Sequence, residues 1–274
     1  MRSSGVNPLD YNHVLIVADS TRYDTVMRAD APFLKSLGRI RPALSHGTYT
    51  WPSHMAMMMG HLPHCPEDLP LYNRYRQQLW RLGDGRGTGG GQFQEWPFLL
   101  LPTEESLPEG FRKIGFTTVG TGAVSWFSHR IWRDWFDHFL YANDVNSQIE
   151  WFLNSISKSK RFFGFLNFKE THEPYSHGSV VYSMPDRYQE HKLSLGPLTA
   201  KDFSELHNRQ IRALEYLDAR IRYFCSRLPR NTVLAFTADH GECFGEENLF
   251  GHGFWHPKVM EVPLLIAFLD DLPG

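Results

Sequence analysis

Five short, continuous apolar segments are the feature of this sequence that most restricts its fold. They cover residues 13–18, 117–120, 161–168, 232–237 and 262–268. Continuous apolar runs of this length are typical of strands that are buried on both faces of a sheet. The sequence therefore predicts a central sheet with little exposed surface.

Segments with a helical spacing of apolar residues lie between these runs. They cover residues 31–38, 106–115, 144–157 and 200–228. The second begins with Ser-Leu-Pro-Glu and ends in Gly, which supplies a cap, an early proline and a stop. The fourth is the longest and carries its apolar residues on one stripe. Alternation of strands and helices predicts an α/β fold with a mainly parallel sheet.

The composition excludes several classes of protein. The chain has 274 residues, of which 42% are hydrophobic, so it can bury a large core as one domain or at most two. It carries 28 Lys and Arg against 30 Asp and Glu, a formal net charge of −2. This balance excludes a disordered chain and offers no basic surface for nucleic acid. We therefore expect no nucleic-acid partner.

The length of the apolar runs and the spacing of the cysteines indicate the cellular compartment. No apolar stretch approaches the roughly 20 residues that a membrane-spanning helix needs. The three cysteines, Cys65, Cys225 and Cys243, are widely spaced and form no Cys-x-x-Cys pair, which fits a reducing compartment. We expect a cytoplasmic protein without a membrane partner.

Titratable side chains follow three of the apolar runs, at the point where each run ends. These are Asp19, then Lys169 and His172, and then Asp239 and His240. Because ligands of open α/β sheets bind at the carboxyl ends of the strands, we expect these residues to share one rim. A single Asp after a strand is more often a helix cap or turn former, but the coincidence at three strand ends favours a site. Asp together with neutral His is the usual donor set for zinc, manganese or a similar divalent ion.

A fourth segment of interest is the heptapeptide Thr-Tyr-Thr-Trp-Pro-Ser-His, residues 48–54, which is followed by MAMMMG. Pro52 suits the first turn of a helix, and residues 55–59 are expected to continue it as buried helix. Thr50 then lies at a helix N-terminus, where free N–H groups and the helix dipole favour an anion. Thr50 is either a simple N-cap or a nucleophile that attacks a bound phosphate or sulfate once a base or metal ionises it.

Four of these blocks together resemble the sulfatase branch of the alkaline phosphatase superfamily. They are VLIVADSTRYD, SHGTYTWPSHMAMMMGHLP, FLNFKETHEPY and LAFTADHGECFGEENLFGHGFWHPKVMEVPLLI. The blocks follow the family's order and span almost the whole chain. The resemblance implies an alkaline-phosphatase-like three-layer α/β/α sandwich with a mainly parallel central sheet.

The resemblance also implies a metal site. Asp19, Asp239 and His240 would bind a divalent ion (zinc, manganese or calcium), and the Thr50 oxygen would be a further ligand as well as the nucleophile. His172 and His252 would face the anionic group of the substrate or hold a second metal.

The substrate side of the implied site contains further basic residues. His172 or His252 would protonate the leaving group, which makes both catalytic as well as substrate-binding. His54 stands where sulfatases carry an Arg that supports the nucleophile, and we expect it to bind the substrate. Lys169 is either a substrate-binding point charge for an anion or a solvated rim lysine.

These roles lead to three hypotheses about function. The first is a metal-dependent hydrolase or transferase acting on a phosphate or phosphonate ester, a small anionic substrate, through Thr50. Threonine cannot give the formylglycine of true sulfatases, which favours this hypothesis. The alternatives are sulfate-ester hydrolysis or another biosynthetic reaction on the same scaffold, and a non-catalytic binding protein.

The domain organisation follows from the same comparison. We expect one sulfatase-like catalytic domain over residues 1–274, without the longer C-terminal part usual in the family. Residues 66–104 are expected to be a variable insertion that carries a glycine-rich loop.

Structural roles are expected for several other polar and aromatic residues. Arg22 and Asp24 are expected to form an ion pair near the site, and Glu242 and Glu246 to shape a loop rather than to bind metal. The tryptophans in this group are expected to pack in the core: Trp126, Trp132 and Trp135.

Overall fold

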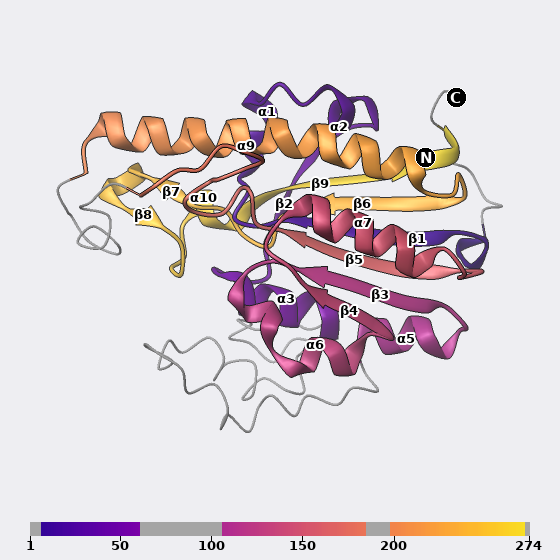
Figure 1. Cartoon of the computed structure of the whole chain (residues 1–274). Coiled ribbons are helices and arrows are strands. Elements are labelled where there is room, and N and C mark those ends of the chain that lie inside the picture. The colour runs from indigo at the N-terminus through magenta and orange to yellow at the C-terminus, as the bar shows by residue number, and fades with distance from the viewer. Residues whose placement is uncertain (1–6, 61–105, 185–197, 272–274) are drawn as a thin grey trace.

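A seven-stranded mixed sheet forms the centre of the protein in a computed structural model, which describes residues 7–60, 106–184 and 198–271 (Figure 1). Strands β6, β1, β5, β3 and β4 are parallel neighbours, whereas β9 runs antiparallel to both β6 and β2. The order across the sheet is β2 (Arg41–Leu44), β9 (Glu261–Phe268), β6 (Thr232–Thr237), β1 (Asn12–Ala18), β5 (Phe162–Phe168), β3 (Thr117–Gly122) and β4 (His138–Tyr141).

Helices cover both faces of this sheet. One layer contains α1 (Tyr23–Arg28), α2 (Pro32–Ser36), α7 (Val145–Ile156) and α9 (Ala200–Arg227). The other contains α3 (Thr50–Met59), α5 (Leu107–Lys113) and α6 (Arg130–Trp135). Successive strand residues alternate between the layers, so Ile16 of β1 packs with the first and Val17 with the second. The predicted three-layer α/β/α sandwich is confirmed.

Side-chain caps explain where three of the helices begin. Ser106 accepts a hydrogen bond from the Glu109 N–H at the start of α5, and Asp144 accepts two at the start of α7. Thr199 forms a capping box with Asp202 at the start of α9. These caps supply acceptors for N–H groups that the helix itself leaves unpaired.

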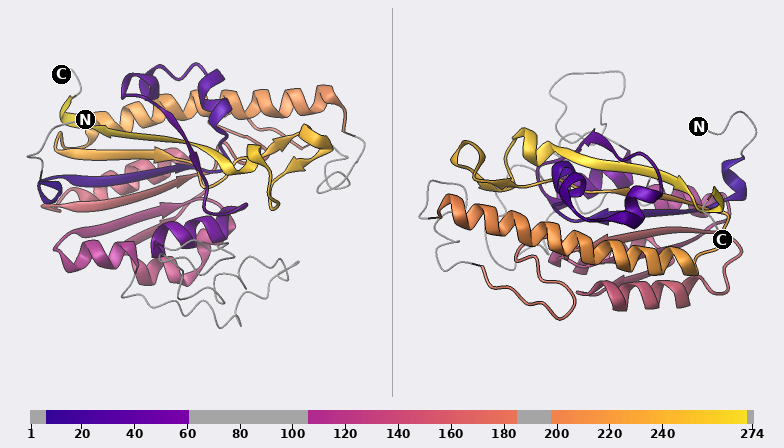
Figure 2. Two further views of the ribbon diagram at one scale, coloured as in Figure 1. Left: turned by 180° about the vertical axis from the view of Figure 1, so that it is seen from behind. Right: turned by 90° about the horizontal axis from the view of Figure 1, so that it is seen from above.

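Several smaller elements lie at the two ends of the sheet strands. The strands β7 (Cys243–Phe244) and β8 (Phe250–Gly251) pair as a hairpin, and α10 (Pro257–Met260) precedes β9. The short 3-10 helices are Pro8–Asp10, Ser125–Ser128, Glu246–Asn248 and Leu269–Asp271. Figure 2 shows α9 running along the strand direction, with the hairpin near its N-terminal end.

All five predicted strands are present, as are the helices predicted at 31–38, 106–115, 144–157 and 200–228 and the buried helix predicted after Thr50, with ends that differ by a few residues. Helices α1 and α10, strands β2 and β4, and the β7–β8 hairpin were not predicted. Strand β4 lies at the edge of the sheet, its apolar segment is short, and none of its four residues is buried. The same holds for β2, which contains a proline.

Other expectations concern cysteines, membrane spans and the insertion. Cys225 and Cys243 are both buried and unpaired. Within the described ranges, no helix combines the length and the apolar character that crossing a membrane requires. The expected insertion at 66–104, with its glycine-rich loop, and Cys65 lie outside the described residues.

Candidate active site

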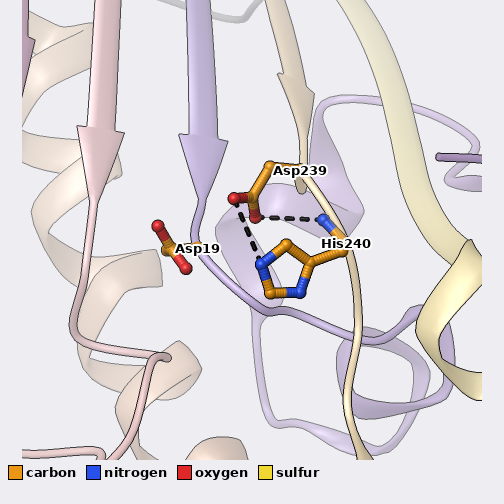
Figure 3. A group of neighbouring side chains, drawn as sticks. All are labelled: Asp19, Asp239 and His240. Atoms are coloured by element: carbon orange, nitrogen blue, oxygen red, sulfur yellow. Dashed lines mark hydrogen bonds and ion pairs between the residues drawn. The ribbon is translucent and has the colours of Figure 1, made fainter. Parts of the chain in front are cut away.

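Two carboxylates and one imidazole meet where the adjacent strands β1 and β6 end (Figure 3). Asp19 directly follows β1, while Asp239 and His240 follow β6. Each offers a ligand atom, and these atoms all lie within 4.8 Å of one another. All three side chains have no exposed surface. The sheet therefore brings together the three residues predicted from separate strand ends.

Hydrogen bonds hold both carboxylates in place. Asp239 Oδ1 accepts from the backbone N–H groups of Ser20 and His240, each at 3.0 Å. Asp19 accepts from the Ser20 hydroxyl at 3.0 Å and from Asn167 Nδ2 at 3.2 Å. Asp239 Oδ2 is buried and has no hydrogen-bond partner among the described residues. An orphaned carboxylate oxygen of this kind is a free ligand atom.

The imidazole of His240 is oriented in the same way. Its Nδ1 lies 2.9 Å from the Gly241 carbonyl oxygen, which can only accept. Nδ1 therefore carries the proton, and the lone pair of Nε2 is directed to the cluster, 3.4 Å from Asp239 Oδ2. This is the usual arrangement of a histidine that ligates a metal through Nε2.

The electrostatics of the cluster also fit a cation. Burial raises the pKa of Asp239 to about 7, and the nearby Asp19 carboxylate adds to the rise. Burial also raises the pKa of Asp19, but electrostatic interactions with His172 and the other nearby histidines, together with the hydrogen bond from Asn167, outweigh it and leave the pKa below its ordinary value. Two buried carboxylates with an orphaned oxygen and a neutral imidazole form a donor set for a divalent ion such as zinc. Asp19, Asp239 and His240 thus fit the predicted metal.

Thr50 is the first residue of α3 and lies against this cluster. Its Oγ1 is 3.4 Å from His240 Nε2, and only 3% of the residue is exposed. Pro52 lies in the first turn, where a missing N–H costs nothing, as the sequence predicted. The hydroxyl of Ser45 donates to the Asp239 carbonyl and ties the segment before α3 to the same rim. The helix N-terminus and the cluster therefore meet at one hydroxyl.

Two further histidines, His252 and His172, line the rim beside the cluster. The ring of His252 lies 4.3 Å from that of His240 and 5.7 Å from that of His172, centre to centre. Nδ1 of His172 is 2.9 Å from the Glu173 carbonyl, and Nδ1 of His252 is 2.9 Å from a Glu242 carboxylate oxygen. Since these partners accept, both rings carry a proton on Nδ1, as His240 does, and have Nε2 available.

The two outer histidines differ in charge preference. Burial lowers the pKa of His172, but the carboxylates of Asp19 and Glu242 outweigh it, so the pKa lies above its ordinary value. Burial lowers the pKa of His252 well below its ordinary value, and the neighbouring His240 and His172 add to this. His172 is the better proton donor of the pair.

Glu242 lies behind His252 and is held there by hydrogen bonds to both of its carboxylate oxygens. Its Oε2 accepts from the Tyr175 hydroxyl at 2.6 Å, and the carboxylate has no exposed surface. Burial raises the pKa of Glu242, which the nearby His172 opposes. The expectation that Glu242 shapes a loop agrees with these contacts, because it joins three segments behind the rim. A carboxylate that fixes an imidazole in this way is a common partner of functional histidines.

His54 lies behind Thr50 and not on the open side of the rim. Its Nδ1 is 2.8 Å from the Thr50 carbonyl oxygen and 3.6 Å from Asp239 Oδ2. Its ring is fully buried and edge-on to the rings of Phe127 and Phe165. This burial favours a positioning role for His54 over the direct substrate contact that the sequence suggested.

Lys169 directly follows β5 and is half-buried. Among the residues that the structure describes, no hydrogen bond or ion pair joins it to Asp19, Asp239 or Thr50. Its charge helps to lower the pKa of Asp144, although burial opposes this shift. Its role toward an anion stays a prediction.

The expected ion pair beside the site is confirmed. Arg22 donates to both carboxylate oxygens of Asp24, at 2.7 and 2.6 Å, and to Glu246 at 2.7 Å. Its guanidinium also donates to the Glu242 carbonyl. The arginine side chain is 3% exposed, so its charge is committed to these partners and holds the hairpin against α1.

Sequence reasoning missed several residues that support the site. Asn167 was visible as a polar residue in a buried apolar run, and such a residue needs a partner. Tyr175 belongs to a block that was recognised but received no role. Ser20, which follows the first aspartate, bonds both carboxylates.

The sequence also matches a family of known proteins. The Sulfatase family matches residues 11–273, almost the entire chain. The chain belongs to the sulfatase family. No match was found among curated protein sequences.

Solved structures of sulfatase-like proteins share the fold. The C-terminal periplasmic domain of EcEptC from Escherichia coli, in complex with zinc, has a TM-score of 0.64 at 14% identity, over 97% of this chain and 74% of that one. The periplasmic domain of phosphoethanolamine transferase EptC from Campylobacter jejuni has a TM-score of 0.58 at 15% identity, over 93% and 78%. BT1596, a 2-O GAG sulfatase, has a TM-score of 0.60 at 15% identity, over 94% and 65%. At these identities the likeness shows the fold.

Proposed function

We propose that this chain is a metal-dependent hydrolase or transferase that acts on a phosphate or phosphonate ester through Thr50. One observation carries the proposal: the Thr50 hydroxyl lies at the N-terminus of α3 and 3.4 Å from His240, within the Asp19–Asp239–His240 cluster. A nucleophile, an anion-favouring helix end and a cation-binding donor set thus share one point.

The proposed reaction has two displacement steps. Thr50 Oγ1 loses its proton to solvent and forms a bond to phosphorus as the bond to the leaving oxygen breaks. A divalent ion, when bound by Asp19, Asp239 and His240, supplies positive charge that favours the ionised hydroxyl and offsets charge on the phosphoryl oxygens. Water or an acceptor alcohol then attacks the phosphorus and releases Thr50.

The rim histidines have separate roles in this proposal. His172, whose pKa is raised, protonates the leaving oxygen at Nε2, while Glu173 holds its other nitrogen. His252 stays neutral and is aimed at the phosphoryl group by Glu242. His54 keeps the first turn of α3 against Asp239.

Phosphoryl chemistry is favoured over sulfate-ester hydrolysis because the nucleophile is a threonine. The structural neighbours of this chain include proteins of both kinds, since one is a phosphoethanolamine transferase and another a 2-O GAG sulfatase. A purely binding role is disfavoured by the buried carboxylate pair, which stays costly without a cation. The cytoplasmic location and a small anionic substrate stay predictions.

Substitution of the nucleophile tests the proposal. The purified chain, loaded with zinc or manganese, is assayed on matched aryl phosphate, phosphonate and sulfate esters. Thr50→Ala should abolish phosphoester turnover, and Thr50→Ser should retain part of it. Thr48→Ala, two residues away, is the matched control and should behave as the parent, because Thr48 accepts from the Gly253 N–H through its backbone carbonyl, which alanine retains. Undiminished turnover by Thr50→Ala would refute the assignment, and turnover of the sulfate ester alone would favour the sulfatase alternative.

A further inference from the structure

The side chain of Gln210 on α9 is completely buried and uses its amide in full. Its Nε2 donates to the carbonyl oxygens of Ser20, at 2.9 Å, and Thr171, at 3.1 Å. Its Oε1 accepts from the Thr25 hydroxyl at 2.7 Å. Because both carbonyls can only accept, the orientation of the amide is fixed by its partners.

Both carbonyls belong to residues that contact the two aspartates of the site: Ser20 bonds their carboxylates, and Thr171 bonds the backbone of Asp19. Ser20 bonds Asp239 through its N–H and Asp19 through its hydroxyl. The Thr171 hydroxyl donates to the backbone carbonyl oxygen of Asp19 at 2.8 Å. Gln210 thus links the two loops that follow β1 and β5, at the points where those loops hold the aspartates.

The backbone of Ser20 requires such support. Its φ is +61°, a left-handed conformation that is uncommon for a residue other than glycine. In this conformation the Ser20 N–H and hydroxyl reach different aspartates. The bond from Gln210 to the Ser20 carbonyl fixes the next peptide unit and so favours the turn.

A chain of hydrogen bonds that begins at the exposed Arg28 and becomes buried at Thr25 fixes Gln210 from the other side. Arg28 donates to His207 Nδ1 at 3.1 Å, so His207 must donate from Nε2 to the Thr25 hydroxyl, 2.9 Å away. Thr25 then donates to Gln210. Burial, with the charge of Arg22, lowers the pKa of His207 to about 4, which keeps the ring neutral in this arrangement. All donors point toward the site, and bonds in such a chain strengthen one another.

We propose that Gln210 is a positioning residue for the metal site: it holds the Ser20 turn and Thr171 so that Asp19 and Asp239 present their oxygens together. The inference rests on the proposed metal site and extends it to a residue in the middle of the long helix. Removal of comparable supporting groups in other proteins weakens metal binding 10–100-fold, and the same loss is expected here.

Metal titration of the whole chain tests this role. Zinc affinity is measured by competition with a chromogenic chelator for the parent, Gln210→Met and Thr25→Val, at a temperature where circular dichroism shows each to be folded. Methionine keeps the length of glutamine but makes none of its three hydrogen bonds. Gln210→Met should bind zinc about 10–100-fold more weakly. Thr25→Val, which removes the hydroxyl alone, should show a smaller loss in the same direction.

Asp218→Ala is the matched control. Asp218 lies on the same helix, is 4% exposed, and accepts from the N–H groups of Phe33 and Leu34 at the start of α2. It therefore ties α9 to the N-terminal segment as Gln210 does, but away from the site. Asp218→Ala should lower the thermal midpoint and leave zinc affinity unchanged.

The outcomes separate the two proposals. Zinc binding by the parent together with equal binding by Gln210→Met would overturn the positioning role and leave the proposed function intact. An equal loss of affinity in Asp218→Ala would also overturn it, because the effect would then be general destabilisation. A parent chain that binds no divalent metal would refute the proposed function and this inference together.

Discussion

Replacement of Gly241 by alanine should disrupt the segment that carries His240. Gly241 follows the metal-site histidine and is buried, and a Cβ atom added there would lie 2.2 Å from the backbone carbonyl oxygen of Lys258. The obstacle is backbone, so no side-chain rotation can relieve the contact. Gly241 also donates from its N–H to the Val259 carbonyl at 2.7 Å.

The geometry sets the size of the effect. Relief of the contact requires a movement of about 1 Å, which would also stretch the bond to Val259 beyond hydrogen-bonding range. Overpacking of this kind costs about 1–3 kcal/mol, and a lost buried hydrogen bond adds about 1 kcal/mol. We expect Gly241→Ala to lower the free energy of unfolding by about 3 kcal/mol, which corresponds to a thermal midpoint roughly 6–12 °C lower.

Gly110→Ala provides the matched comparison. Gly110 lies in α5, and a Cβ there would meet no atom within 4 Å. Both variants reduce the freedom of the unfolded chain equally, so they differ only in the folded state. Gly110→Ala should stabilise the protein by about 0.5–1 kcal/mol. The midpoints are measured by circular dichroism; a midpoint for Gly241→Ala at or above that of Gly110→Ala would refute the steric argument.

Three further predictions concern pH, capping and metal. Burial raises the pKa of Glu170 from an ordinary 4.5 to about 7, so the folded state holds the proton more tightly and loses stability as pH rises through that range. Glu170→Gln should therefore have a free energy of unfolding, measured in urea, that is up to about 3 kcal/mol higher than that of the parent at pH 8 and little different below pH 4.5. An equal difference at both pH values would contradict this. Asp144→Ala should lower the free energy of unfolding in urea by about 1 kcal/mol, because the N–H groups of Asn146 and Ser147 lose their cap. Asp144→Ser should keep most of that stability, because serine can also cap the helix. Removal of the metal by a chelator should lower the thermal midpoint of the metal-loaded parent. The loss corresponds to about 4 kcal/mol of stability when the free metal concentration before chelation is about 1,000 times Kd, and the midpoint of Asp19→Asn should not change.

The inner strands could be predicted because burial on both faces leaves a continuous apolar run. The edge strand β4 has one neighbour and only partly covered faces, and its apolar run, residues 139–142, is too short to identify a strand by itself. The direction of β9 was also not foreseen. The chain between β6 and β9 forms the β7–β8 hairpin with its 3-10 helix and the four-residue α10, but no crossover helix of the kind that usually joins parallel strands. Antiparallel pairing of β9 with β6 agrees with the absence of such a helix from this segment.

The residues at strand ends were the predictable part of the site. Asp19, Asp239 and His240 each follow a recognisable strand, and adjacent parallel strands bring their ends together. Tyr175 and Glu242 are 67 positions apart, and no local pattern predicts that their side chains meet. Gln210 sits inside an amphipathic helix, where a polar residue ordinarily marks the solvent face, so only the packed structure reveals its partners.

The length of α9 between its two polar attachments carries a constraint of its own. Gln210 hydrogen-bonds to the loops at the site, and Asp218 hydrogen-bonds to the start of α2, about two helical turns further along α9. One inserted residue between them would rotate one attachment by about 100° and shift it by about 1.5 Å relative to the other. The two anchors could then no longer reach their partners at once. The spacing of these anchors is thus as restricted as their identity, and length changes in this helix can be accommodated only outside residues 210–218.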